Sequence, residues 1–288
     1  MLEKDTSIKH RVKLVRWQTR RLVTAARWGS EKLASTPAVL GNAMPKSGSH
    51  LIIQILQGLT KFGPFVNPGF PPVNRTENNL QLADQAVLDK LFRMRPGDIG
   101  YGYLKANEKY IAALTRPGIC SIFLFRDPRD MIVSHVFYAT DMFTGHGMHE
   151  YYNEKLETKE DRINAAIGGV TEPGFELRGV QDRYNAYIRW FEEPDILCLR
   201  FEDLRLDTDN SLSKILDYLE LEGFRPEIDR DQAVNTLRSA INPKKSGTFR
   251  KGKPGNWRDH FTQRNIDYFK ETAGDLLINL GYEQDYSW

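Results

Sequence analysis

Three short segments of the chain combine cations, hydroxyl side chains and glycines in patterns suited to binding phosphate. They are residues 45–51 (PKSGSHL), 126–134 (RDPRDMIVS) and 249–257 (FRKGKPGNW). A small turn at a helix N-terminus offers free backbone N–H groups, and a guanidinium together with a hydroxyl can hold one phosphate from two sides. Each segment alone is also typical of a surface turn or a solvated loop, so their meaning depends on whether the fold brings them together.

The first segment differs from the P-loop of nucleotide kinases. The P-loop pattern is G-x-x-x-x-G-K-[S/T], whereas here Lys46 precedes Gly48. A kinase also needs an apolar strand that ends in a Mg²⁺-binding aspartate, and the nearest candidate, FLFRD, places Arg126 before the aspartate. A P-loop kinase is therefore an alternative that the sequence disfavours.

Alternating strands and helices are expected around these segments. Apolar runs predict strands over residues 38–44, 98–104, 121–126 and 196–201. Apolar spacing and N-cap residues predict helices over 49–59, from Asp127, from Asn210, and from Thr262 to Gly281. This alternation predicts an α/β fold, a three-layer α/β/α domain with a central parallel sheet that is P-loop-like in its first strand–loop–helix unit. Ligands of such folds bind beyond the carboxyl ends of the strands.

The composition is that of a globular protein with a sizeable core. Of 288 residues, 40% are hydrophobic and 27% are charged, and the formal net charge of +2 gives no indication of nucleic-acid binding. Cys120 and Cys198 lie in apolar runs, so we expect buried thiols rather than a disulfide. No apolar run is long enough to predict a transmembrane helix, and no apolar signal core opens the chain. These features favour a cytoplasmic protein.

We expect residues 1–288 to form one domain. Residues 1–35 are basic and predict an amphipathic helix packed on that domain, although a membrane surface or a partner would also suit such a helix. Residues 139–180 are polar, with glycines and aromatic residues at intervals. This composition predicts a mobile cover over the binding site rather than part of the core.

Taken together, the three segments resemble the nucleotide-binding elements of the sulfotransferases that use 3′-phosphoadenosine 5′-phosphosulfate (PAPS). Those elements read P-K-S-G-T, R-x₇-S and R-K-G-x-x-G-[D/N]-W, and Ser49 here takes the place of the threonine. The resemblance runs from about residue 38 to 282 and leaves out 1–35 and 139–180. It implies the sulfotransferase fold and the transfer of a sulfuryl group, without a metal, from PAPS to a hydroxyl or nitrogen of a small organic acceptor.

The resemblance assigns donor-binding roles residue by residue. The residues that would hold the 5′-phosphosulfate are Lys46, Ser47, Gly48, Ser49 and His50, with Leu51 where animal cytosolic members have a tryptophan. The residues that would hold the 3′-phosphate are Arg126, Ser134, Arg250, Lys251 and Gly252. The adenine would lie near Phe201 and Leu237. A site that holds the 3′-phosphate would select PAPS over ATP.

Lys46 is the expected catalytic cation, because a positive charge on the oxygen that leaves with the 5′-phosphate stabilises the transition state. The general base departs from the family pattern, since Tyr103 stands where cytosolic members have a histidine. A phenol with a pKa of about 10 is a weak base at pH 7. Three explanations stay open: Lys46 or Lys105 lowers the pKa of Tyr103, another group such as His50 accepts the proton, or the acceptor needs no base. The further candidate bases are His135, Asp141, His146 and His149.

The acceptor pocket is expected to be aromatic, which suits a small molecule better than a polysaccharide. Its candidate walls are Phe65, Phe70, Phe137, Tyr138, Phe143, Tyr151 and Tyr152. His146 and His149 lack supporting ligands at metal-site spacing, so no metal is expected. Whether the chain forms a homodimer is left open. A nucleotide-binding protein of the same fold without turnover is a further alternative, which the presence of Lys46 disfavours.

Overall fold

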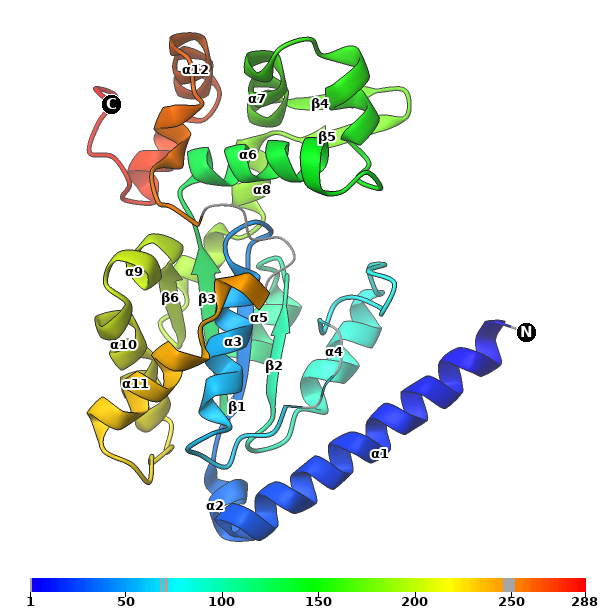
Figure 1. The fold of residues 1–288 in the computed structure, drawn as a ribbon, viewed down its shortest axis with the longest axis vertical. Coiled ribbons are helices and arrows are strands. Elements are labelled where there is room, and N and C mark those ends of the chain that lie inside the picture. Colours follow the sequence, from blue (N-terminus) through cyan, green and yellow to red (C-terminus); the bar gives the residue numbers. More distant parts are fainter. Residues whose placement is uncertain (1, 68, 70–71, 246–251) are drawn as a thin grey trace.

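The computed structural model describes residues 2–67, 69, 72–245 and 252–288. Within those residues, the centre of the molecule is a sheet of four parallel strands in the order β2-β1-β3-β6 (Figure 1). The strands are β1 (Ala38–Ala43), β2 (Ile99–Gly102), β3 (Ile119–Phe125) and β6 (Ile196–Arg200). Each lies where an apolar run predicts a strand.

Successive residues of the two central strands pack into different cores. In β1, Leu40 belongs to one hydrophobic core and Val39 to the other, and in β3 Phe123 and Ile122 divide in the same way. Both strands are buried along their whole length. Helices on both faces of a parallel sheet explain why these two strands read as continuous rather than alternating apolar runs.

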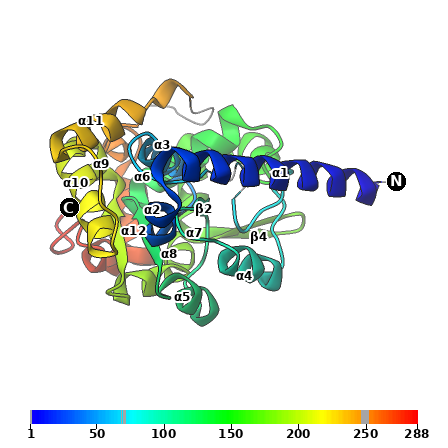
Figure 2. The same ribbon diagram turned by 90° about the horizontal axis from the view of Figure 1, so that it is seen from below.

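Helices cover both faces of the sheet (Figures 1 and 2). The core that contains Val39 and Ile122 is shared with α3 (Ser49–Leu59), α9 (Phe201–Leu206), α10 (Thr208–Leu221) and α11 (Arg230–Ala240). The core that contains Leu40 and Phe123 is shared with α4 (Asp84–Phe92), α5 (Glu108–Leu114), α6 (Pro128–Phe137), α7 (Lys159–Gly168), α8 (Val180–Asn185) and α12 (Gln263–Asn279). The expected three-layer α/β fold with a central parallel sheet is confirmed.

The predicted helix signals are correct at two helices and wrong at a third. Asp127 caps α6 by accepting the Arg129 N–H, and Thr262 caps α12 in a capping box. The helix α10, however, begins at Thr208 with Asp207 at its N-cap, so Asn210 lies inside it. The Asn210 side chain donates a hydrogen bond to the Asp207 carboxylate at 2.9 Å, and therefore supports the helix start without forming it.

Residues 139–180 are not simply a cover, which corrects the sequence-based expectation. The segment contains the π-helical turns at Tyr138–Met142 and Tyr151–Lys155, helix α7, and a hairpin of β4 (Gly169–Glu172) and β5 (Phe175–Arg178). Tyr152, Ile163 and Ile167 are buried in the same core as α6 and α12. Much of this segment therefore supports α6, which carries site residues.

The N-terminal helix α1 (Leu2–Trp28) is long, and its first half extends away from the sheet (Figures 1 and 2). It is joined by α2 (Ser30–Ser35), and its inner side is fixed at Asp98, which accepts hydrogen bonds from Trp17 and Arg21. The short 3₁₀ turns are Ile188–Glu192, Pro243–Lys245 and Asn256–Asp259. Among the residues that the structure describes, no helix has the length and apolar character needed to cross a membrane.

Candidate donor and acceptor site

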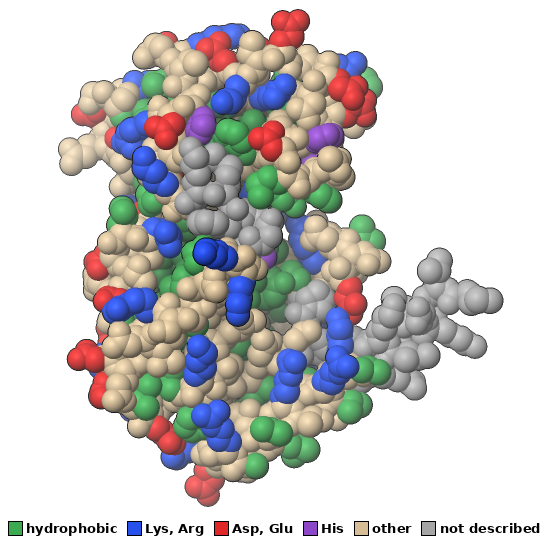
Figure 3. All heavy atoms as spheres, viewed as in Figure 1, with side chains coloured by type: hydrophobic (Ala, Val, Ile, Leu, Met, Phe, Trp, Pro, Cys, Tyr) green, Lys and Arg blue, Asp and Glu red, His purple; other side chains and the backbone are tan. Residues whose placement is uncertain are grey.

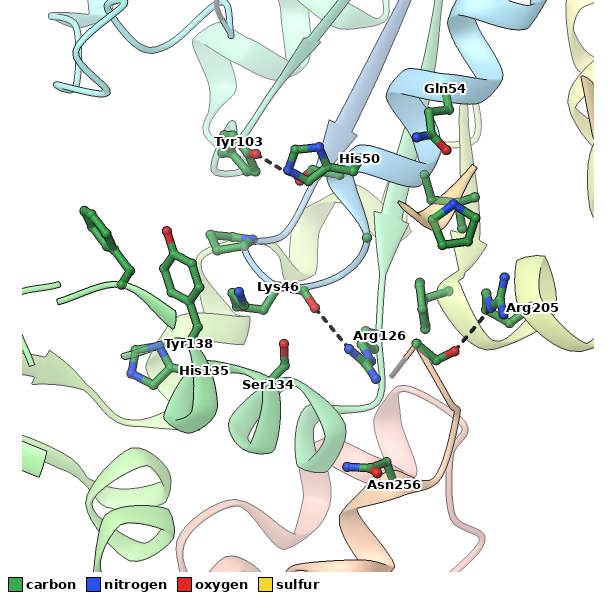
Figure 4. Close-up of a pocket in the computed structure, with 18 of the residues that line it drawn as sticks. Lys46, His50, Gln54, Tyr103, Arg126, Ser134, His135, Tyr138, Arg205 and Asn256 are labelled. Carbon is green, nitrogen blue, oxygen red and sulfur yellow. Dashed lines mark hydrogen bonds between the residues drawn. The ribbon is translucent and has the colours of Figure 1, made fainter. Parts of the chain in front are cut away.

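The strand order places a ligand crevice at the carboxyl ends of the central strands. The chain leaves β1 toward β2 on one side and later returns to β3 on the other, and ligands bind where the direction reverses in this way. A cavity of about 400 Å³ lies there. Its lining includes Lys46 after β1, Tyr103 after β2 and Arg126 after β3. Figure 4 shows these three side chains around the cavity.

The turn between β1 and α3 leaves polar groups available to an anion. Gly48 occupies the N-cap of α3 without a side-chain cap, so the first N–H groups of the helix lack a side-chain acceptor there. The hydroxyl of Ser47 is fully buried and has no hydrogen-bond partner in the described residues. An anionic ligand at this turn would give these donors acceptors and would also benefit from the helix dipole.

Gly48 permits the turn to approach the opposite wall. Its φ of 96° is in the left-handed region, and an added Cβ would lie 2.6 Å from the Phe201 ring. Phe201 in turn stacks under the Arg126 guanidinium, whose central carbon is 4.5 Å from the ring centroid. Phe201 therefore lines the cavity and fixes both the turn and Arg126.

Lys46 is a cation whose charge is poorly solvated. Burial, together with the nearby Arg126, lowers the pKa of Lys46 to about 8. Its Nζ lies 3.6 Å from the centroid of the Tyr138 ring, in a cation–π contact. The ammonium group thus stands between the turn and α6 and would be stabilised by a bound anion.

Arg126 is not neutralised by a close ion pair. Its Nη2 is 3.4 Å from Asp130 and its Nη1 is 3.4 Å from the Lys46 carbonyl oxygen, both at the long end for a hydrogen bond. Its Nε is buried without a partner among the described residues. Ser134 lies further along α6 and also lines the cavity. Arg126 and Ser134, the two expected phosphate ligands of this segment, therefore line the same cavity.

Asp130 joins the second segment to the third. Its two carboxylate oxygens accept the N–H groups of Gly255 at 2.9 Å and Trp257 at 2.8 Å. Gly252 and Asn256 line the cavity, and both polar atoms of the Asn256 side chain are buried without a partner in the described parts of the chain. The expected phosphate ligands Arg250 and Lys251 lie outside the described residues.

Tyr103 and His50 lie next to each other at the first turn of α3 (Figure 4). The Tyr103 hydroxyl donates to the Ser49 hydroxyl at 2.9 Å, and the Arg75 guanidinium lies 5.5 Å from the centroid of the Tyr103 ring. Burial and the nearby Lys46 lower the pKa of His50, so its imidazole is neutral at pH 7. Both side chains line the cavity.

Two of the expected binding residues lie away from the cavity surface. Leu237 is fully buried and packs on Gly58 of α3, so it supports α3 from behind and is not placed to contact an adenine in this structure. Ser47 lies beneath the turn rather than in the lining. The other described donor-binding residues that line the cavity are Lys46, Gly48, Ser49, His50, Leu51, Arg126, Ser134, Phe201 and Gly252.

The aromatic walls are fewer than expected. Tyr138 and Phe143 line the cavity. The remaining described candidates pack elsewhere, namely Phe65 against Phe224, Phe137 beside His260, and Tyr151 and Tyr152 in the core. Phe70 lies outside the described residues.

The other histidines differ in what they offer. Burial and the nearby Arg183 hold the pKa of His135 well below its ordinary value, and its Nε2 has no partner in the described chain. The Nδ1 of His146 accepts the Met148 N–H, which leaves that nitrogen unavailable as a base. Asp141 and His149 lie outside the cavity lining. Among the described residues, no group of three or more His, Cys, Asp or Glu side chains is placed to hold a metal.

Several residues of the cavity lining were not predicted from the sequence, among them Arg75, Asn79, Gln54 and Arg205. Arg205 follows Phe201 by one turn of α9 and donates to the Gly252 carbonyl oxygen at 3.2 Å, so helical spacing was a signal for it. Arg75 and Asn79 lie in an irregular turn without such a signal. On the face drawn in Figure 3, basic and hydrophobic side chains lie next to one another across the middle of the molecule.

The fold and the site define a three-layer α/β protein of the P-loop-like kind, with a cavity beside the turn between β1 and α3 at the point where the strand order reverses. The chain belongs to the sulfotransferase family, because a model of the sulfotransferase domain matches residues 37–281. The match continues through residues 139–180, contrary to the expectation that they lie outside the resemblance. Residues 1–35 do lie outside it.

Curated relatives are distant in sequence. The chain is 25% identical over 173 residues to Sulfotransferase 2A1 of Rattus norvegicus, which covers 55% of this chain and 57% of that relative. It is 23% identical over 254 residues to Sulfotransferase 2A2 of the same species, which covers 82% of each. The chain thus spans little more than half the length of the first of these relatives.

Solved structures share the fold. Mouse sulfotransferase SULT7A1 complexed with PAP aligns with a TM-score of 0.58 and 17% identity, over 86% of this chain and 88% of that one. Retinol dehydratase in complex with androsterone and inactive cofactor PAP aligns with a TM-score of 0.53 and 17% identity, over 90% and 85%. At these identities the likeness establishes the sulfotransferase fold.

Proposed function

We propose that this protein transfers a sulfuryl group from PAPS to a hydroxyl or nitrogen of a small organic acceptor and releases 3′-phosphoadenosine 5′-phosphate (PAP). The observation that carries the proposal is the pair of anion-binding places in one cavity. Among the described residues, the N-terminus of α3 has no side-chain cap on one side of the cavity, and the Arg126 Nε has no partner on the other. The PAP named in the two related structures supports the same donor.

The donor would lie across the two places. The 5′-phosphosulfate fits the turn at residues 46–50, and the 3′-phosphate fits Arg126 and Ser134. Arg250 and Lys251 stay predicted ligands of that phosphate. The Phe201 ring would contact the adenine side, while Leu237 supports α3 and is no longer part of the proposed contact. We propose that residues 1–288 act as one domain, and a cytoplasmic location stays a prediction.

Lys46 would stabilise the charge that forms during transfer. As the bond between sulfur and the bridging oxygen breaks, negative charge grows on the oxygen that leaves with the 5′-phosphate. The Lys46 ammonium stands at this turn in a partly buried setting, where a charge interacts more strongly than in water. The sulfuryl group then forms its new bond with the acceptor oxygen or nitrogen, which loses a proton.

We assign that proton to His50 rather than Tyr103. The imidazole of His50 is neutral at pH 7 and has a lone pair to accept a proton. The Tyr103 hydroxyl instead donates to Ser49, so its role is to position Ser49 and to bound the acceptor. His50 is also exposed to solvent, which lets the proton leave to water.

Calorimetric titration with PAP, 5′-AMP and ATP tests the proposal directly. We expect PAP to bind and the two ligands without a 3′-phosphate to bind about 10- to 100-fold more weakly, as for the loss of charge-assisted hydrogen bonds. Arg126→Gln should remove this difference, whereas Arg238→Gln, which breaks an exposed ion pair far along α11, should keep it. Equal binding of all three ligands, or Mg²⁺-dependent binding of ATP alone, would contradict the proposal.

A further inference from the structure

The cavity has a surplus of positive charge. Its described lining contains no aspartate or glutamate and five cationic residues, which are Lys46, Arg75, Arg126, Arg205 and Lys253. Lys46 and Arg126 lie at the two proposed anion places of the donor. Arg205 donates a hydrogen bond to the carbonyl oxygen of Gly252, the residue before Lys253. Both cations are therefore assigned to the 3′-phosphate place, to which Gly252 belongs. Arg75 is the one described lining cation that the proposed donor does not account for.

Arg75 is fixed beside Tyr103 in the cavity lining. The preceding residue, Asn74, bonds to the Tyr103 backbone in both directions: its Nδ2 donates to the Tyr103 carbonyl oxygen at 2.9 Å and its Oδ1 accepts the Tyr103 N–H at 3.1 Å. The Arg75 guanidinium then lies over the Tyr103 ring. The position of Arg75 therefore follows from the hydrogen bonds that Asn74 forms with the Tyr103 backbone, directly after β2.

The charge of Arg75 has no carboxylate partner within the described chain. Of the five N–H groups of its guanidinium, one Nη1 group donates to the Asn79 carbonyl oxygen at 3.0 Å, and the described residues offer it no other hydrogen-bond acceptor. The acidic residue of the same turn, Glu77, forms its ion pair with Lys13 of α1. The neighbouring cavity imidazoles of His50 and His146 are neutral at pH 7, because burial and Lys46 lower their pKa values.

A half-buried guanidinium with free N–H groups is suited to an oxyanion, which it can hold through two parallel charge-assisted hydrogen bonds. The aromatic side chains of Tyr138 and Phe143 line the same cavity. We propose that the acceptor is a small aromatic acid, whose hydroxyl or amino group receives the sulfuryl group while Arg75 binds its carboxylate or an equivalent oxyanion. This inference rests on the proposed sulfuryl transfer and specifies the substrate class for the same site.

Matched acceptor pairs test the inference. The probes are 4-hydroxybenzoate and 3-(4-hydroxyphenyl)propanoate, each beside its uncharged primary amide, with PAPS as donor and PAP release as the readout. We expect kcat/KM of the acids to exceed that of the amides by about 10- to 100-fold, the range for a charge-assisted hydrogen bond. Arg75→Gln should abolish this preference by lowering kcat/KM of the acids while changing that of the amides less than about threefold.

A variant that reverses the charge at Arg75 distinguishes loss of the carboxylate contact from a disturbance of the structure around that residue. Arg75→Glu is expected to turn over tyramine better than 3-(4-hydroxyphenyl)propanoate, since only the sign of the charge at that place has changed. A purely structural role for Arg75 would lower turnover of acids, amides and amines alike, which would overturn the inference. Equal turnover of acid and amide by the unchanged protein, or turnover of neither, would also overturn it.

PAP binding separates failure of this inference from failure of the proposed function. The unchanged protein and Arg75→Gln are each titrated with PAP, and we expect affinities within about twofold of each other, because Arg75 is not among the proposed donor ligands. Normal PAP binding without a preference for acids rejects the aromatic acid alone. Absence of PAP binding in the unchanged protein rejects the donor, and the inference with it.

Discussion

Lys46 and His50 titrate on opposite sides of neutral pH, and the proposed roles require opposite protonation states. Lys46 acts as a cation with a pKa of about 8, so kcat/KM should fall as pH rises above that value. His50 acts as a neutral base with a pKa below its ordinary value, so kcat/KM should fall only at pH values below the ordinary titration range of a histidine. We therefore expect a plateau between these two limits, measured as the pH dependence of kcat/KM.

Three variants assign the limbs of this profile. Lys46→Arg should remove the alkaline limb, because a guanidinium stays charged throughout the range. His50→Gln should remove the acid limb and lower kcat by about 10²- to 10⁴-fold, as for the loss of a general base. Tyr103→Phe is the matched control and should keep both limbs. An alkaline limb that persists in Lys46→Arg would mean that another group titrates there.

The site residues differ in how far the sequence alone identifies them. The turn at 45–51 and Arg126 were predictable, because their chemistry is local to a strand end and a helix start. Arg75 was not predictable, since its place depends on the hydrogen bonds between Asn74 and Tyr103. Leu237 was misassigned because only the packing of α11 on α3 decides whether its apolar side chain faces the cavity or the core.

The first turn of α6 and the segment before α12 are coupled through Asp130. Asp130→Asn replaces one carboxylate oxygen with an NH₂ group that faces a backbone N–H or the Arg126 guanidinium. We expect PAP affinity to fall about 10- to 100-fold and the free energy of unfolding to fall by about 1–3 kcal/mol, the range for a buried hydrogen bond left unmade. Calorimetry and urea unfolding measure the two effects.

The control for this variant is Asp209→Asn. Asp209 of α10 forms an exposed ion pair with Arg238 of α11, with about half of each side chain accessible to water. Exposed pairs contribute little to stability, so both measurements should stay near those of the unchanged protein. PAP affinity equal to that of the unchanged protein in Asp130→Asn would show that the segment from Gly252 to Trp257 holds its place without this carboxylate.

The helices and strands were predictable where the residues of the element itself indicate that it is buried. They were predicted incorrectly where burial depends on partners distant in the sequence. The strands β1 and β3 read as apolar runs because both of their faces are covered. Residues 139–180 read as a polar cover because their few buried side chains, such as Tyr152 and Ile163, are separated by polar residues. Their partners in α6 and α12 are distant in the sequence, so no local pattern indicates that they form a core.

The molecule as a whole consists of the sulfotransferase domain, which the family model matches over residues 37–281, and the long helix α1, which lies outside that match. The domain and α1 are in contact at Asp98, directly before β2. Asp98 is 3% exposed. Its Oδ1 accepts from Trp17 at 3.1 Å and from Arg21 at 2.8 Å, and its Oδ2 accepts the Arg95 N–H at 2.9 Å. Because the cavity is lined by other elements, α1 should contribute to stability and not to donor binding.

Removal of residues 1–28 should therefore leave PAP affinity within about twofold and lower the free energy of unfolding by about 3–5 kcal/mol, the cost of a buried charge that loses its partner. Asp98→Asn distinguishes this cause from a general loss of packing. The substitution should destabilise the full chain, because Arg21 loses the carboxylate with which it pairs. It should stabilise the shortened chain, because there the Asp98 charge has already lost Arg21. Urea unfolding of the full and the shortened chain, each with and without Asp98→Asn, gives the coupling free energy between Asp98 and residues 1–28. The same sign of effect in both backgrounds would contradict the role given to Asp98, and a loss of PAP binding on shortening would extend the site to α1.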